Sequence, residues 1–286
     1  MKVIEDFDLT EYNSYRIRTK CKRAVFLESE QDVLEYFSNK SVEKVLLGSG
    51  HNVILSKSYY EQDFVIFNGN YNAFSVDQST GTIEAESGIT MTRLSMVAQG
   101  LGLSGLEVFY DIPSSLGGAV IMNAGASGEE IKDVLIKVRY LDMVDMEVKE
   151  IDKESIGFEY RNSFFQINTD KIVLKAWLKL IPKDPISIQE KMNIIKAARW
   201  AKQPRDFPNA GSVFKRPKGY YVGALMDELN LKGYTVGGAK ISEKHGGFIV
   251  NFNNASGNDI LSIIKEVQSK VNQLTGIELE IEQRII

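Results

Sequence analysis

The sequence contains a single cysteine, Cys21, and it has no hydrophobic run that approaches the length of a membrane span. One cysteine rules out an internal disulfide and leaves too few thiolates for a cysteine-based zinc site, so we expect no metal. Residues 1–15, MKVIEDFDLTEYNSY, have no apolar stretch behind a basic start. We therefore expect neither a secretory signal nor a membrane anchor, and a cytoplasmic location.

A strong excess of charge is also missing. The formal net charge is −4 over 286 residues, which gives no electrostatic reason to expect nucleic acid or an anionic membrane as a partner. A local cluster of cations could still hold an anionic ligand. Hydrophobic residues make up 43% of the chain and charged residues 25%, a balance typical of globular proteins with one large or two medium domains.

Hydrophobic periodicity predicts mixed α and β structure. Short alternating runs predict strands at 25–27, 44–47, 64–67, 74–77, 82–86, 131–141, 147–151, 172–180 and 248–252. Apolar residues at helical spacing predict helices over 31–39 and 222–229, after Thr90, after Ser187 and after Ser256.

The ends of these elements carry local signals. Ser187 with Glu190 and Ser256 with Asp259 have capping-box spacing, and Gly276 is expected to end the last helix. Residues 277–286 alternate and predict a closing strand whose glutamates form one face. A solvated face is the ordinary interpretation of that row, and one glutamate reaching a site is the alternative.

A glycine-containing turn follows the strand 44–47. Two glycines directly after a strand let backbone N–H groups converge on an anion, which would suit a pyrophosphate. The turn lacks the third glycine and the following helix of a dinucleotide-binding fingerprint. A plain tight turn is the other interpretation. The residues concerned are Gly48, Ser49, Gly50, His51, Asn52 and Val53.

Segment 105–128 is the most glycine-rich part of the chain. Its small residues make a poor core but a suitable surface for a flat cofactor. Close packing of a helix on a strand would explain Gly117 and Gly118 equally well, but it explains Asn123 and Gly125 less well.

Segment 199–217, RWAKQPRDFPNAGSVFKRP, combines cations, prolines and small residues. Arg199 and Lys202 end a predicted helix, and the prolines that follow fix an extended path. Small residues up to Ser212 would let the backbone approach another molecule closely. The alternative is an ordinary loop in which Ser212 hydrogen-bonds the backbone.

Arg161 lies between aromatic residues in FEYRNSFF. Its guanidinium could stack on a neighbouring ring at the surface. It could equally stabilise an oxyanion that develops during a reaction.

Taken together and in order, seven segments resemble the UDP-N-acetylenolpyruvoylglucosamine reductase family. They span nearly the whole chain, which is far more specific than any single glycine motif. The segments are NSYRI, LGSGHNVIL, GLSGLEVFYDIPSSLGGAVIMNAGASG, FEYRNSFF, KQPRDFPNAGSVFK, LKGYTVGGAKISEKHGGFIVN and LEIEQRI.

The resemblance implies an α+β protein made of two domains. Residues 1–185 would form a two-lobed FAD-binding domain of the vanillyl-alcohol-oxidase/PCMH type, with lobes at about 1–67 and 68–185. Residues 186–286 would form an α+β substrate-binding domain, after a linker at Pro182–Pro185. The short interval from Arg161 to Ser212 resembles the subtype that lacks an inserted tyrosine loop. A monomer is expected.

The implied reaction uses FAD as cofactor and NADPH as reductant. Hydride passes from NADPH to the flavin and then to the enolpyruvyl group of UDP-N-acetylglucosamine enolpyruvate, giving UDP-N-acetylmuramate for peptidoglycan synthesis. By the same resemblance Ser212 is the proton donor, and Arg161 and Glu282 stabilise the enolate-like intermediate. The cofactor would contact 48–53, Gly117, Gly118, Asn123 and Gly125, and the substrate Lys202, Arg199, Arg216, Lys232 and His245.

Several positions depart from the family pattern. Arg18-Thr19 replaces a glycine pair, Asp111 replaces a glycine, Arg216 replaces an asparagine that contacts substrate, and His51 replaces a small residue. The histidine leaves open a flavoprotein oxidase of the same superfamily with covalently bound flavin. A non-catalytic binding module is the other alternative, and the joint presence of Ser212, Arg161 and Glu282 argues against it.

Overall fold

The computed structural model describes residues 1–67 and 69–286. The chain forms two compact units. The first comprises 1–4, 24–49 and 62–197, and the second comprises 5–23, 50–61 and 198–286. In the described part of the chain, no helix combines the length and hydrophobicity needed to cross a lipid bilayer. Within the same residues, no group of three or more His, Cys, Asp or Glu side chains is arranged to hold a metal ion.

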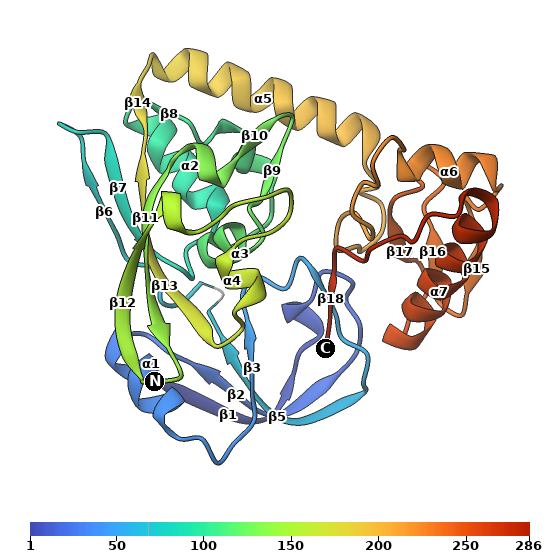
Figure 1. Ribbon diagram of the computed structural model, residues 1–286, viewed down its shortest axis with the longest axis horizontal. Coiled ribbons are helices and arrows are strands. Elements are labelled where there is room, and N and C mark those ends of the chain that lie inside the picture. The colour runs from blue at the N-terminus through green and yellow to red at the C-terminus, as the bar shows by residue number, and fades with distance from the viewer. Residues whose placement is uncertain (68) are drawn as a thin grey trace. The chain divides into compact units, whose positions relative to one another are not determined.

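An antiparallel five-stranded sheet dominates the first unit (Figure 1). Helices α2 (Met91–Gly100) and α3 (Leu116–Ile121) pack their apolar side chains into the core of this sheet. Thr90 accepts a hydrogen bond from the N–H of Arg93 and so caps α2, as predicted. The strand order is β12 (Glu147–Asp152), β11 (Leu135–Asp142), β13 (Lys171–Lys179), β7 (Thr82–Glu86) and β6 (Phe74–Asp77).

A second sheet has the order β1 (Lys2–Asp8), β2 (Lys20–Phe26), β5 (Tyr59–Ile66) and β3 (Lys44–Leu47). β3 and β5 run parallel, with Leu47 opposite Ile66. Helix α1 (Glu30–Ser38) is capped by Ser29 and buries Val33 and Phe37 in a core that includes residues of β2 and β5. The helix predicted over 31–39 is therefore confirmed, beginning and ending one residue earlier.

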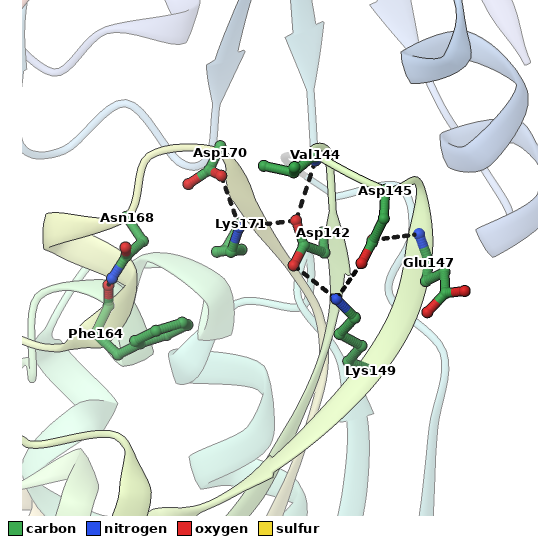
Figure 2. A network of polar contacts seen from close by, with 9 residues as sticks. All are labelled: Asp142, Val144, Asp145, Glu147, Lys149, Phe164, Asn168, Asp170 and Lys171. Carbon is green, nitrogen blue, oxygen red and sulfur yellow. Dashed lines mark hydrogen bonds and ion pairs between the residues drawn. The ribbon is translucent and has the colours of Figure 1, made fainter.

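Paired charges tie together the turn between β11 and β12 (Figure 2). Asp142 accepts from Lys171 Nζ at 2.7 Å and from Lys149 Nζ at 2.9 Å, and Lys149 also pairs with Asp145. Lys171 also contacts Asp170 at 2.6 Å. Hydrogen bonds from the two lysines hold the pKa of Asp142 well below its usual value. Each of these carboxylates and lysines has a partner of opposite charge, so this cluster stabilises the turn.

Shorter elements complete the first unit. They are β8 (Leu103–Ser104), paired with β14 (Ile181–Pro182), β9 (Gly125–Ala126), paired with β10 (Glu129–Glu130), helix α4 (Phe164–Ile167), and 3-10 turns at Glu107–Asp111, Ile131–Asp133 and Lys153–Ser155.

The second unit packs helices on a three-stranded antiparallel sheet of β15 (Thr235–Val236), β16 (Ala239–Ile241) and β17 (Ile249–Asn251). Helix α7 (Gly257–Thr275) buries its apolar stripe in this core. The Ser256–Asp259 capping box and the left-handed Gly276 at its end are confirmed. The remaining elements are α6 (Val222–Glu228), a 3-10 turn at Thr10–Tyr12, and β4 (Val53–Ile54), parallel to β18 (Arg284–Ile285).

Two local predictions were wrong. Helix α5 (Pro185–Lys202) begins before Ser187, and Asp184 Oδ2 accepts from both the N–H and the hydroxyl of Ser187 at 2.9 Å. Asp184 is therefore the cap, and Ser187 lies inside the helix. Pro185 suits the first helical position because it has no N–H that needs a partner.

The closing segment 277–286 is not one continuous strand. The N–H of Lys215 donates to Glu280, that of Glu282 donates to Val213, and that of Arg284 donates to Asn52. The segment thus changes its backbone partner between Glu282 and Arg284, and only Arg284–Ile285 form a strand.

Candidate active site

Residues Ala210–Val213, which we call the Ser212 loop, lie between two other segments of the second unit. On one side the N–H of Val213 donates to the carbonyl of Gly247 at 3.0 Å. On the other side its carbonyl accepts from the N–H of Glu282 at 2.8 Å. Gly211 has φ +81°, a conformation that glycine adopts without steric cost, and its N–H donates to Asn209 Oδ1. The loop is therefore held from both sides.

These bonds bring Ser212 and Glu282 onto adjacent, paired segments. Both residues are half-buried. Within residues 1–67 and 69–286, the Ser212 hydroxyl makes no hydrogen bond to the protein. The interpretation in which this serine only hydrogen-bonds the backbone is therefore wrong, and the hydroxyl is available to donate a proton to a ligand.

Asn52 supports the backbone on the other side of Glu282. Its Nδ2 donates to the carbonyl of Glu282 at 3.1 Å, and its own carbonyl accepts from the N–H of Arg284 at 2.9 Å. Gly50, two positions before Asn52, packs closely against the backbone of Tyr12. A Cβ on Gly50 would lie 2.0 Å from the carbonyl oxygen of Tyr12. Asn52 thus uses its side chain on the Glu282 segment. Its predicted cofactor contact, like those of Gly50, His51 and Val53, stays a prediction.

Gln283 was not predicted from the sequence as a site residue, and it is only 4% exposed. Its Oε1 accepts from the hydroxyl of Tyr15, and its Nε2 faces three consecutive carbonyls of the Ser212 loop. A signal was present in the sequence. Positions 277, 279, 281 and 285 are all aliphatic, and Gln283 interrupts that row at a position where burial is expected.

Arg161 belongs to the first unit and sits in a tight turn closed by reciprocal backbone bonds between Glu159 and Asn162. Its φ is +54°, which is uncommon for a residue with a side chain. Nη2 donates to the carbonyl of Gly125 at 3.0 Å, and the guanidinium lies 5.2 Å from the Tyr160 ring centroid. The arginine is anchored at one edge. Its approach to Ser212 and Glu282 stays a prediction.

Asn123 supports the same turn. It is fully buried, with Nδ2 donating to Glu130 Oε2 at 3.0 Å and to the carbonyl of Glu159 at 2.9 Å. Its Oδ1 accepts from the N–H of Lys132 at 3.4 Å. The Asn123 side chain and the Gly125 carbonyl thus both bind the turn that contains Arg161. A cofactor contact of these two residues stays a prediction.

The glycine segments of the first unit meet at the start of α3. The Ser115 N–H donates to Ser49 Oγ at 3.2 Å, and a Cβ on Gly48 would lie 2.8 Å from Ser115 Oγ. A Cβ on Gly117 would lie 2.9 Å from the Cβ of Ser87. The first glycine turn and the glycine-rich helix start, far apart in sequence, therefore form one small-residue surface, which we call the glycine cradle. Gly118 has more room, its nearest neighbour being Ser115 Oγ at 3.3 Å.

Two hydroxyls beside the glycine cradle lack partners in the described chain. They are Ser87 Oγ and Ser114 Oγ, both buried at the atomic level, and Ser87 is 2% exposed as a residue. Burying a hydroxyl without a hydrogen bond is unfavourable, so these atoms point to a polar group that binds there. A cradle that side chains would fill, edged by unpaired hydroxyls, fits the phosphate and ribityl groups of FAD.

Cations predicted to bind substrate lie in the second unit. Arg199 and Lys202 are in the last turn of α5. Lys232 Nζ pairs with Asp227 at 2.6 Å. His245 is half-buried and accepts from the N–H of Gly247 through Nδ1 at 3.1 Å. Burial, together with the charge of Lys232, lowers the pKa of His245 below its usual 6.5, so the ring is neutral at pH 7.

Arg216 is exposed, and its guanidinium lies 4.7 Å from the ring centroid of Tyr221. It also borders a cavity of about 370 Å³. The cavity is lined by Lys215, Arg216, Pro217, Lys218, Ile277, Glu278 and Glu280. Lys215 is paired with Glu280 at 2.6 Å, which leaves Arg216 and Lys218 as the cations that could meet an anion there.

Comparison with known proteins gives two family matches. Residues 23–151 match the model of the FAD binding domain family. Residues 203–286 match the model of the C-terminal domain of UDP-N-acetylenolpyruvoylglucosamine reductase. A reductase of that name from Francisella tularensis is 38% identical over 284 residues, which cover 99% of each chain. The chain belongs to the UDP-N-acetylenolpyruvoylglucosamine reductase family.

Further relatives agree with this assignment. A UDP-N-acetylenolpyruvoylglucosamine reductase from Thermosipho melanesiensis is 40% identical over 84% of this chain and 81% of its own. The crystal structure of the reductase from Thermus caldophilus superposes with a TM-score of 0.82 at 28% identity, covering 99% of this chain and 98% of that one.

Membership of the reductase family confirms the fold class, the FAD cofactor and the assignment as an FAD-dependent oxidoreductase. The residue-by-residue roles and the division into domains at residue 185 stay predictions.

Proposed function

We propose that this protein reduces the enolpyruvyl group of UDP-N-acetylglucosamine enolpyruvate to give UDP-N-acetylmuramate, with NADPH as reductant. The observation that supports the proposal is the backbone pairing of the Ser212 and Glu282 segments, together with a Ser212 hydroxyl that makes no hydrogen bond in the described part of the chain. When bound, FAD accepts hydride from the nicotinamide and delivers it to the enol ether. The residues of the chain then have to place the substrate and supply a proton.

Ser212 supplies that proton to the substrate carbon next to the carboxylate. The loop around it is held by backbone bonds to Gly247 and Glu282, so its position is fixed before substrate arrives. Removing such a proton donor slows the step by about 10²-fold or more.

Arg161 and Glu282 stabilise the intermediate that precedes proton transfer. A guanidinium is planar and always charged, so it can bind both oxygens of the substrate carboxylate as negative charge develops. The bond from Nη2 to Gly125 holds one edge of the group in place. Glu282 lies on the segment that pairs with the Ser212 loop and is proposed to assist in orienting the reacting carbon and its proton donor.

The sugar nucleotide is held by cations of the second unit. Lys232, Lys202 and Arg199 are proposed to contact the diphosphate, with neutral His245 as a hydrogen-bonding neighbour. Arg216 borders the cavity described above and has a free edge because its guanidinium face stacks on Tyr221. We propose that it replaces the asparagine of the family pattern as a diphosphate contact.

The protein is proposed to act as a cytoplasmic monomer in peptidoglycan precursor synthesis, and so in cell-wall formation, cell shape and division. A covalent flavin at His51 and a non-catalytic role are the alternatives that the following experiment distinguishes from this proposal.

Anaerobic stopped-flow absorbance tests the proposal by separating the two half-reactions. NADPH should bleach the flavin absorbance, and adding the enolpyruvyl sugar nucleotide should restore it at the rate of turnover. A flavin that NADPH reduces but that this substrate does not reoxidise would contradict the proposed substrate. Flavin that stays on acid-precipitated protein would favour the oxidase alternative instead.

A further inference from the structure

A buried polar clamp joins three segments of the second unit behind the Ser212 loop. The hydroxyl of Tyr15 donates to Gln283 Oε1 at 2.9 Å, across 268 positions of sequence. Gln283 Nε2 in turn contacts the carbonyls of Ala210 at 3.0 Å, Gly211 at 3.3 Å and Ser212 at 3.3 Å. Tyr15 is fully buried and Gln283 is 4% exposed, so water does not compete for these bonds.

The orientation of the amide follows from its neighbours. Backbone carbonyls only accept hydrogen bonds, so the NH₂ group must face the loop and the amide oxygen must face the Tyr15 hydroxyl. Two N–H groups are shared among three acceptors, which ties consecutive carbonyls of the Ser212 loop to one side chain. The backbone of Tyr15 is fixed as well, because Asn251 Nδ2 donates to the Tyr15 carbonyl oxygen at 2.8 Å.

The clamp binds the loop at the Gly211 and Ser212 carbonyls, next to the proposed proton donor. Gly211 has no side chain, and its φ of +81° is one of several conformations open to it, so the peptides on either side of it are intrinsically free to rotate. The peptide before Gly211 is also held at the Gly211 N–H by Asn209, and the peptide after Ser212 is also held at the Val213 N–H by Gly247. The bond from Gln283 to the Gly211 carbonyl fixes the peptide between Gly211 and Ser212, which those two bonds do not reach.

We infer that Gln283, oriented by Tyr15, is a positioning residue that sets the direction of the Ser212 hydroxyl for proton transfer. The inference rests on the proposed role of Ser212. Gln283 touches neither the hydroxyl nor the Glu282 carboxylate in any described contact, so it acts through the backbone. A displacement of about 1 Å at such a site can cost about 10²-fold in rate.

Gln283→Met tests the inference, because it keeps the length of the side chain and removes both polar groups. We expect flavin reduction by NADPH and FAD affinity to be unchanged. Reoxidation of the reduced flavin by the enolpyruvyl sugar nucleotide should slow by about 10- to 100-fold, with kcat lowered and KM little changed.

Tyr15→Phe provides a second variant that disturbs the packing less. It removes one hydroxyl at nearly constant volume and should slow reoxidation by a smaller factor, about 3- to 10-fold, since the amide loses its orienting partner but keeps its carbonyls. In the double variant the two losses should not multiply, because Tyr15 acts through Gln283.

Gln268→Met is the matched control. Gln268 is a glutamine of α7 whose Nε2 donates to the carbonyl of Leu279 at 2.8 Å, in the same closing segment but away from the Ser212 loop. This control should lower stability without changing reoxidation. If Gln283→Met and Tyr15→Phe reoxidise at the wild-type rate while Ser212→Ala does not, the inference is overturned. If Ser212→Ala itself reoxidises at the wild-type rate, the proposed function fails first.

Discussion

The backbone N–H of Glu282 donates to the carbonyl oxygen of Val213, next to Ser212, at 2.8 Å. A carboxylate from the end of the chain and a hydroxyl some seventy positions earlier are thereby fixed on neighbouring segments of one unit. This backbone bond joins two segments of the proposed site, as catalysis by positioning requires.

Ser212→Ala should leave flavin reduction by NADPH intact and slow flavin reoxidation by the enolpyruvyl sugar nucleotide by about 10²-fold or more, because only the second half-reaction needs the proton. Anaerobic stopped-flow absorbance measures both steps. Ser262→Ala, an exposed serine of α7 that bonds the carbonyl of Asn258, is the control. Equal losses in both half-reactions would contradict the role of Ser212.

Arg161→Lys should slow reoxidation by about 10²-fold, since a lysine keeps the positive charge but cannot bind Gly125 and a carboxylate with one planar group. The strained backbone is the same in both proteins, so stability should change little. Arg93→Lys is the control, because Arg93 also stacks on a ring, that of Phe74 at 5.4 Å. If Arg161→Lys reoxidises at the wild-type rate, the proposed role of the Arg161 guanidinium in stabilising the intermediate is contradicted.

Ser87→Ala should have opposite effects on the apo and FAD-bound forms. Removing an unpaired buried hydroxyl should raise the free energy of unfolding of apoprotein by about 1 kcal/mol. The same change should raise the FAD dissociation constant by about 5- to 20-fold, because the cofactor loses a hydrogen bond.

Thermal unfolding of apoprotein and quenching of flavin fluorescence measure these two effects. Gly117→Ala should weaken FAD binding more than Gly118→Ala, since only the Gly117 methyl would meet the Ser87 backbone and Cβ. Tighter FAD binding in Ser87→Ala would show that the cofactor does not contact this hydroxyl.

Acidification should destabilise the protein through His245. Burial lowers its pKa in the folded state below 6.5, so beneath that pH the unfolded chain binds the proton more readily than the folded one. The free energy of unfolding should therefore fall as pH is lowered from 6.5 toward the folded pKa. Urea unfolding at pH 7.5, 6.5 and 5.5 measures it, and His245→Gln should flatten the slope. If the free energy of unfolding of His245→Gln depends on pH as steeply as that of wild type, His245 is not the cause of the acid destabilisation.

Asp142→Asn should lower the free energy of unfolding at pH 7, because Lys149 and Lys171 lose their shared partner. The pKa of Asp142 is held below its usual 3.8, so its contribution is complete above that pH and is lost as pH falls through the folded value. The difference between wild type and variant should narrow below pH 3.8. Asp145→Asn, on a more exposed carboxylate with one lysine partner, should cost less.

Local interactions were predictable from sequence because their partners are near neighbours. Ser256, Asp259 and Gly276 define the ends of α7 through hydrogen bonds within a few positions. The strands β3, β6 and β7 were predicted at their observed bounds, since a short apolar run or an apolar–polar alternation is a property of the segment itself. The ordered motifs also sufficed to indicate the family, its cofactor and its α+β fold.

What the tertiary structure alone decided depends on contacts across the chain. The sequence singled out Ser212 and Glu282, but only the fold shows that their segments pair, and only the fold connects Tyr15 with Gln283. Asn123 was predicted to contact the cofactor, which stays a prediction, and only the fold shows that its side chain donates to Glu130 and to the carbonyl of Glu159. Periodicity reports which side of an element is buried, but the partner on that side is chosen by packing and by the requirement that buried polar groups be paired.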